Sequence, residues 1–94
     1  MPSDENSKMA RLFRSLSSEV RMEIIRLLLA SEKPIHIKGI ARSLKLDYAA
    51  AYRHIEDLRE VGLVDIYEVG RSRVPYVKRK AEVAMLLDAA NKLL

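Results

Sequence analysis

The stretch LDYAAAYRHIEDLREVGLV, from Leu46 to Val64, contains the signals for both ends of one helix. Asp47 is a good N-cap residue, because its carboxylate can accept hydrogen bonds from free backbone N–H groups and its charge suits the positive end of the helix dipole. Gly62 is typical of the position just after a helix, where the backbone often turns left-handed. The stretch therefore predicts a helix from about Tyr48 to Val61.

This predicted helix has an apolar face and a polar face. At about 100° per residue, Ala51, Ile55 and Leu58 point in one direction, toward a core. The residues on the opposite side and its flanks are Ala49, Arg53, Glu56, Glu60, Tyr48, Tyr52 and Asp57. An α-helix fits the major groove of B-DNA and reaches base edges with its N-terminal residues. We therefore interpret the first two turns of the polar face as a surface that contacts DNA.

Apolar spacing predicts the elements that flank this helix. Before it, we expect an N-terminal helix through Met9, Leu12, Phe13 and Leu16, a second helix from a cap at Ser17 or Ser18 to just before Pro34, and a short third helix from Ile37 to Leu44. After it, we expect two strands, over Leu63–Val69 and Val74–Val77. The last expected element is a C-terminal helix through Val83, Leu86, Leu87, Ala90, Leu93 and Leu94. Ile35–Ile37 alternates in hydrophobicity and is also readable as a very short strand. Pro75 favours an edge position for the second strand.

These elements predict a mainly α fold with a small β-hairpin. Two short helices joined by the three-residue turn Lys45–Asp47, and followed by a two-stranded hairpin, make a winged helix-turn-helix. We expect a single domain over residues 1–94, because this length is near that of one hydrophobic core. The polar segment Met1–Ser7 is expected to be disordered.

The hairpin carries the most one-sided charge in the chain. The net charge of the whole sequence is +4 and its pI is about 9.6, which alone is weak support for nucleic-acid binding. Gly70–Lys80, however, contains five basic residues and no acidic residue. Arg71, Ser72 and Arg73 are placed at the predicted hairpin tip, where long cationic side chains reach a DNA backbone or minor groove. The alternative is that they are merely solvated turn residues.

Composition excludes several classes of function. The sequence has no cysteine, which rules out disulfides, thiolate metal sites and cysteine nucleophiles. No apolar run approaches the roughly 18 residues of a membrane span, and no signal-peptide pattern is present. No P-loop, HExxH motif or nucleophile elbow occurs, so we expect neither an enzyme nor a cofactor. The expected location is the cytoplasm, in association with the nucleoid, with no membrane partner.

Three segments together resemble the ArsR-type winged-helix transcriptional regulators. They are LSSEVRMEIIRLLL, IARSLKLDYAAAYRHIEDLREVGLV and YEVGRSRVPYVK, and the similarity covers roughly Leu16 to Lys78, about two thirds of the chain. The most specific parts are Arg53-His54 and the later Gly62-Leu63-Val64. The resemblance implies a homodimer on operator DNA, with a recognition helix at Tyr48–Val61, a wing at Val69–Pro75, and dimerisation through the first and last helices.

The candidate site residues follow from the pattern and the resemblance together. They are Tyr48, Ala49, Tyr52, Arg53 and His54 in the recognition helix; Arg71, Ser72 and Arg73 in the wing; and Met9, Leu12, Phe13, Leu16, Val83, Leu86, Leu87, Ala90, Leu93 and Leu94 in the dimer interface, with residues 80–94 as a dimerisation helix. The alternatives are a solvated Arg53, tyrosines packed on a neighbouring helix, and a C-terminal apolar stripe packed on its own domain.

The sequence departs from the family pattern at the start of the recognition helix. Ala49 and Ala50 stand where serine and threonine are usual, and Tyr52 replaces a common serine, so hydroxyl contacts to phosphate are lost. Many family members sense metals, but this chain has no cysteine and its last helix has no histidine. The sequence thus gives no support to a metal sensor.

The function expected from the sequence is a dimeric, sequence-specific DNA-binding transcriptional regulator. Its expected partners are a second copy of the chain and double-stranded DNA with an approximate inverted repeat. One alternative is a sequence-nonspecific architectural or chromatin-associated DNA-binding protein on the same fold. Another is a winged-helix module that binds other proteins.

Overall fold

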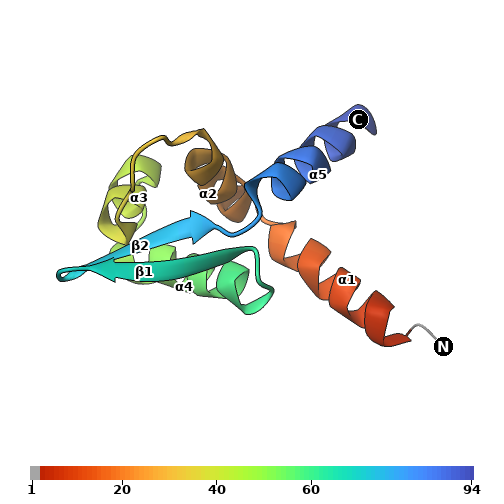
Figure 1. The fold of residues 1–94 in the computed structure, drawn as a ribbon, viewed down its shortest axis with the longest axis horizontal. Helices are drawn as coiled ribbons and strands as arrows, with labels where there is room; N and C mark the ends of the chain where they lie inside the picture. The colour runs from red at the N-terminus through yellow and green to blue at the C-terminus, as the bar shows by residue number, and fades with distance from the viewer. Residues whose placement is uncertain (1–2) are drawn as a thin grey trace.

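Five helices and one hairpin follow one another along residues 3–94, the part of the chain that the computed structural model describes. The elements are α1 (Ser3–Leu16), α2 (Glu19–Ala30), α3 (Ile37–Leu44), α4 (Tyr48–Glu60), β1 (Val64–Val69), β2 (Ser72–Val77) and α5 (Lys80–Lys92). Helices α1 and α5 extend in diverging directions from one end of the body formed by α2, α3, α4 and the hairpin (Figure 1). The hairpin tip points toward the opposite end, and the principal extents are 45 × 27 × 22 Å.

The core lies between α2, α3 and α4, and the hairpin and α5 close it. Its buried side chains are Ile24, Ile25, Leu28, Ile37, Ile40, Ala41, Ala51, Ile55, Leu58, Leu63, Val64, Val77, Val83 and Leu87. Ala51, Ile55 and Leu58 are fully buried, which confirms the predicted inward face of α4. Burial of a side chain the size of Ile or Leu contributes about 1.5–3 kcal/mol. This face therefore fixes the rotation of α4 about its axis and turns the opposite face outward.

Both predicted ends of α4 are confirmed. The backbone N–H of Ala50 donates to Asp47 Oδ1 over 2.7 Å, as expected of an N-cap. Gly62 has φ +84°, and the N–H groups of Gly62 and Leu63 donate to the carbonyls of Arg59 and Leu58. This pair of bonds is a Schellman motif, which satisfies the last carbonyls of the helix.

The turn before α4 is also closed by backbone hydrogen bonds. Lys45 is left-handed, with φ +56°, and the N–H of Leu46 donates to the Ala41 carbonyl over 2.8 Å. Asp47 then caps α4, so the chain redirects between α3 and α4 within three residues, as the sequence predicts. Of the two serines predicted as the cap of α2, Ser18 takes the role, since its side chain accepts from the Arg21 N–H.

The second strand of the hairpin is longer, and the turn shorter, than predicted, whereas the first strand begins one residue later, at Val64. The antiparallel ladder runs from Val64↔Val77 to Val69↔Ser72, so only Gly70 and Arg71 form the loop. Gly70 has φ +60°, a conformation that two-residue hairpin loops require and glycine adopts without strain. Ser72 and Arg73 are therefore strand residues and not turn residues.

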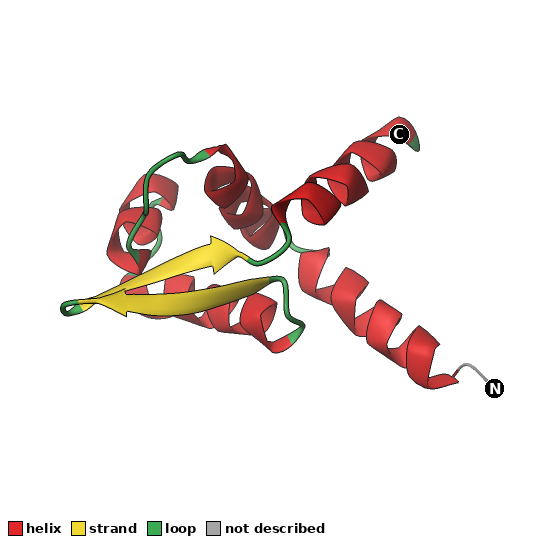
Figure 2. Cartoon of the chain, in the orientation of Figure 1, coloured by secondary structure: helices red, strands yellow, loops and turns green. Residues whose placement is uncertain are grey.

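One further prediction is wrong in the described residues, and one open alternative does not hold. Ser3–Ser7, expected to be disordered, begins α1, and Asp4 and Glu5 in its first turn suit the positive end of the helix dipole. Met1 and Pro2, the rest of that predicted segment, lie outside the described residues. Ile35–Ile37 forms no strand: Ile37 is the first residue of α3, and the sheet of residues 3–94 is the two-stranded hairpin alone (Figure 2).

Candidate nucleic-acid interface

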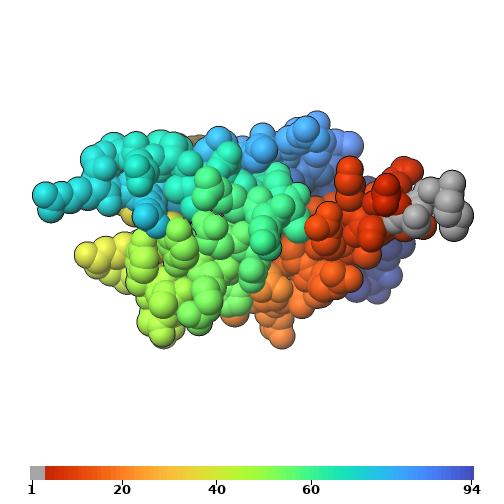
Figure 3. Space-filling model, turned by 90° about the horizontal axis from the view of Figure 1, so that it is seen from below, coloured from red at the N-terminus to blue at the C-terminus, as the bar shows by residue number. Residues whose placement is uncertain are grey.

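The first two turns of α4 lie open to solvent. Tyr48 is 47% exposed, Ala49 and Arg53 are exposed, and Tyr52 and His54 are half-buried. Seen from below, α4 occupies the middle of one face, with the hairpin on one side and α1 on the other (Figure 3). Arg53 makes no ion pair within residues 3–94, so its guanidinium is free for an external partner, and Ala49 presents only a small methyl group beside it.

Tyr52 connects this helix to the wing. The guanidinium carbon of Arg73 lies 5.2 Å from the centroid of the Tyr52 ring, within the range of a cation–π contact. Arg73 Nε also lies 3.7 Å from Glu68 Oε2 on the paired strand. The Tyr48 and Tyr52 rings are 6.2 Å apart between centroids. Arg73 is thus held against α4, whereas Arg71 stands in the loop and is exposed.

His54 and Asp57 are held from behind by Arg21 of α2, a residue that the sequence analysis missed. Arg21 Nη1 lies 3.2 Å from His54 Nδ1 and 3.4 Å from Asp57 Oδ2, and Arg21 Nε donates to the carbonyl of Ser15 in α1. Because a guanidinium only donates hydrogen bonds, Arg21 is the donor in these contacts. Arg21 therefore joins α1, α2 and α4. Its partners on α4 are 33 and 36 residues away in sequence, beyond the reach of periodicity.

The last turn of α4 is fixed to β1 by a charged cluster. Arg59 bonds Glu56 Oε2 at 3.4 Å and Asp65 Oδ1 at 3.1 Å. The hydrogen bond from Arg59 to Glu56 is the main cause that raises the pKa of the Arg59 guanidinium. The pKa of Asp65 is lowered, chiefly because its Oδ1 accepts the Ile66 N–H over 2.8 Å, and further by Arg59. The acidic residues of α4 thus lie toward its C-terminal end, away from the exposed first turns.

The candidate dimer residues fall into three groups by exposure: buried, half-buried and exposed. Val83 and Leu87 of α5 are buried in the core of the same chain, so they need no partner for burial. Leu12, Leu16 and Leu86 are half-buried, and Met9, Phe13, Ala90, Leu93 and Leu94 are exposed. Met9 and Phe13 are 48% and 49% exposed, and Met85, which the sequence analysis did not select, is 68% exposed. Both diverging helices therefore present large apolar side chains to solvent.

Within residues 3–94, no group of three or more His, Cys, Asp or Glu side chains is arranged to hold a metal ion. None of the helices described there has the length and hydropathy needed to cross a bilayer.

The arrangement of α2, α3 and α4 with an adjoining hairpin defines a winged helix-turn-helix protein, with α4 in the position of a recognition helix and the hairpin as the wing. Residues 16–67 match the family model described as "Helix-turn-helix domain". This match covers more than half of the chain, so the chain belongs to that helix-turn-helix family. No curated protein sequence matches the chain.

Solved structures with this fold include several ArsR-type regulators. The homodimeric winged helix-turn-helix DNA-binding domain Mb0332 from Mycobacterium bovis, described as a possible ArsR-family regulator, is 18% identical and has a TM-score of 0.84 over 97% of this chain and 84% of that chain. An ArsR-like regulator from Rhodococcus sp. RHA1 is 25% identical, with a TM-score of 0.74 over 99% and 83%. HlyU from Vibrio cholerae N16961 is 22% identical, with a TM-score of 0.74 over 89% and 90%. The predicted similarity to this class is confirmed.

Proposed function

We propose that the chain is a dimeric, sequence-specific transcriptional regulator that binds an approximate inverted repeat in double-stranded DNA. The observation that carries this proposal is the outward first half of α4 beside the cationic wing. The apolar residues of α4 fix its orientation, so its free side chains are presented on a rigid helix. Such a regulator acts in the cytoplasm on the nucleoid.

Each exposed residue has a role that suits its chemistry. Arg53 binds guanine bidentately or holds a phosphate, and Ala49 allows close approach and touches a thymine methyl group. Tyr48 donates to phosphate or packs on sugar. Arg71 reaches the backbone or minor groove from the wing tip, and its charge contributes to a steep loss of affinity with salt.

Dimerisation is proposed through the apolar sides of α1 and α5. Met9, Phe13 and Met85 are large and exposed, and they lie on the two helices that diverge from the body. Mb0332, which has the same fold, is described as homodimeric. A two-fold axis through these helices would present two copies of α4 to successive major grooves about 34 Å apart.

One observation favours an alternative, a sequence-nonspecific architectural DNA-binding protein. The exposed start of α4 offers Ala49 and Ala50, which cannot hydrogen-bond to a base edge through their side chains. Base discrimination would then rest mainly on Arg53.

A pull-down of genomic fragments with the purified chain, followed by sequencing, tests the proposal. The proposal predicts enrichment of a small set of fragments that share an approximate inverted repeat. Even recovery of the genome would replace the regulator with the architectural protein. Failure to retard any duplex at low salt would reject both and favour a protein-interaction module.

A further inference from the structure

The hairpin meets α4 at two places that differ in kind. At its base, Val64 is buried in the core and Arg59 of α4 bonds Asp65 over 3.1 Å. Nearer the tip, the guanidinium carbon of Arg73 lies 5.2 Å from the centroid of the Tyr52 ring. A hollow of about 410 Å³, lined by residues of both contacts, lies between them. The contact of Tyr52 with Arg73 is therefore the outer support of the wing on α4.

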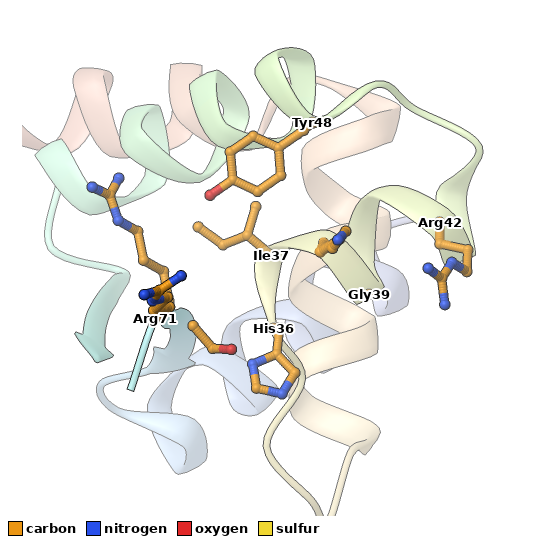
Figure 4. A pocket seen from close by; sticks show the side chains of 9 residues that line it. His36, Ile37, Gly39, Arg42, Tyr48 and Arg71 are labelled. Atoms are coloured by element: carbon orange, nitrogen blue, oxygen red, sulfur yellow. The ribbon is translucent and has the colours of Figure 1, made fainter. Parts of the chain in front are cut away.

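The tip of the hairpin extends past this outer support. Arg71 is exposed and lies across a cavity of about 420 Å³ from Tyr48 and the start of α3 (Figure 4). On the paired strand, Tyr67 and Val69 are 41% and 55% exposed. Because a two-stranded hairpin is only marginally stable by itself in water, the outer half of the wing needs contacts with the rest of the chain to hold one position.

The other face of the hairpin is supported separately. Neighbouring residues of a strand point to opposite faces, so Val74 points away from the face on which Arg73 meets α4. Val74 is buried, and it lines a hollow together with Leu28 and Ile35 of the α2–α3 region. Removal of the Tyr52 ring would thus free the face toward α4 while Val74 still holds the hairpin against the body.

The surroundings of Tyr52 suit a role inside the protein. Tyr52 is half-buried and packs against the core, whereas Tyr48 is 47% exposed. Its ring has Arg73 over it and the Tyr48 ring 6.2 Å away, between centroids. Arg73 is held from the wing as well, since Glu68 Oε2 lies 3.7 Å from its Nε. Tyr52 therefore offers DNA less free surface than Tyr48 does, and it contacts the wing directly.

We propose that Tyr52 is a positioning residue for DNA binding: its ring holds Arg73 and so fixes the wing, which lets Arg71 meet the duplex while α4 enters the groove. This inference rests on the proposed function. A wing that is fixed before binding loses little freedom on binding, so its contacts contribute more to affinity. The rival is direct contact of Tyr52 with DNA, the role that the sequence suggests.

Three variants of the full chain separate these roles. Tyr52→Leu removes the aromatic face and keeps an apolar side chain against the core, and Tyr52→Phe keeps the ring. The matched control is Tyr67→Leu, which removes a tyrosine ring from the face of the hairpin away from α4, since Tyr67 pairs with Val74. Circular dichroism verifies that each variant is folded, and Tyr52→Met replaces Tyr52→Leu if the latter does not fold.

The first arm uses NMR without DNA. In the wild type, the ring current of Tyr52 shifts the side-chain protons of Arg73, and the amides of residues 69–73 have the high order parameters of a fixed wing. We expect Tyr52→Leu to lose this shift and to lower these order parameters. Tyr52→Phe and Tyr67→Leu should both retain the Arg73 shift.

The second arm is a double-mutant cycle on binding to a labelled duplex. We expect Tyr52→Leu to weaken binding by about two- to fivefold, which corresponds to the loss of an exposed cation–π contact, and Tyr52→Phe to bind as the wild type does. In the background Arg71→Ala/Arg73→Ala, Tyr52→Leu should cause no further loss, because no wing contact is left to position.

An equal loss from Tyr52→Leu in both backgrounds would overturn the inference and make Tyr52 a direct DNA contact. Wild-type affinity of Tyr52→Leu, or an unchanged Arg73 shift in that variant, would overturn it as well. Should the wild type bind no duplex, the proposed function fails, and the NMR arm alone decides whether Tyr52 holds the wing.

Discussion

Arg53 is an exposed arginine on the second turn of α4, and it makes no ion pair within residues 3–94. Its position on the helix follows directly from the burial of Ala51 and Ile55 beside it. An unpaired guanidinium on an outward helix face is well suited to bidentate contact with guanine.

We expect Arg53→Ala to weaken binding to the operator by about 1–3 kcal/mol and to relax specificity at one position in each half-site. The check is a competition titration with duplexes that differ at single positions. A uniform loss across all these duplexes would reduce Arg53 to a phosphate contact.

The two wing arginines differ in their surroundings, although the sequence analysis treated them alike. Arg73 contacts the Tyr52 ring and Glu68, and Arg71 contacts neither. Because an exposed cation–π contact contributes about 0.5–1 kcal/mol, Arg73→Ala should lower the free energy of unfolding by about that amount. Arg71→Ala should leave it within about 0.5 kcal/mol, as for most surface changes. Urea unfolding measures both, and equal midpoints for the two variants would remove the Tyr52–Arg73 contact from the account.

At the scale of elements, the relation of α4 to its neighbours depends on charged contacts as well as on the core. Arg21 joins α2 to α4 through His54 and Asp57 and to the end of α1 through the Ser15 carbonyl. The side chain of Arg21 is 18% exposed, so these bonds are only partly screened. The contacts therefore couple the helix proposed for DNA recognition to a helix proposed for dimerisation.

We expect Arg21→Met to destabilise the fold by about 1–2 kcal/mol. This loss is smaller than that expected for fully buried hydrogen bonds to charged groups, because Asp57 is exposed and solvent weakens its contact with Arg21. The comparison is Arg26→Met on the same helix, which is exposed and should change little. Thermal unfolding of both variants gives the difference, and an equal effect would mean that Arg21 acts only through its apolar stem.

The Asp65 carboxylate, which accepts the Ile66 N–H and contacts Arg59 of α4, gives stability a pH dependence. The pKa of Asp65 is lowered in the folded chain, so its contribution is fully present above the unfolded value near pH 4 and is lost as pH falls through the folded value. Wild-type stability should therefore fall more steeply below about pH 4 than that of Asp65→Asn. Unfolding free energies between pH 7 and pH 2 measure this, and parallel curves would contradict it.

The sequence predicts these elements well where the signal is local. The cap at Asp47, the stop at Gly62 and the inward face of α4 each depend on residues within a few positions of one another. The sequence places the hairpin turn over too many residues, because Ser72 and Arg73 follow Gly70 as turn residues often do. Only their pairing with Val69 and Glu68 shows that they belong to the strand. Periodicity likewise places Val83 and Leu87 on the apolar face of a helix, but it does not show that this face packs into the core of the same chain. The role of Arg21 depends on contacts between distant segments, which no local pattern contains.

At the scale of the whole molecule, α1 and α5 extend from one end and the wing tip and α3 project at the other (Figure 1). The first end exposes apolar side chains, and the second gathers cationic ones around a cavity. This polarity suits a protein that pairs with a second copy at one end and meets an anionic polymer along the face of α4. Operator binding of the proposed kind requires that two copies present α4 to one duplex at the same time.

A hydroxyl-radical footprint on a recovered genomic fragment is the most direct measurement of that requirement. We expect two symmetric protected segments whose centres lie about 10–10.5 base pairs apart, because paired recognition helices enter successive major grooves. A single protected segment without two-fold symmetry, or uniform protection without boundaries, would contradict the account.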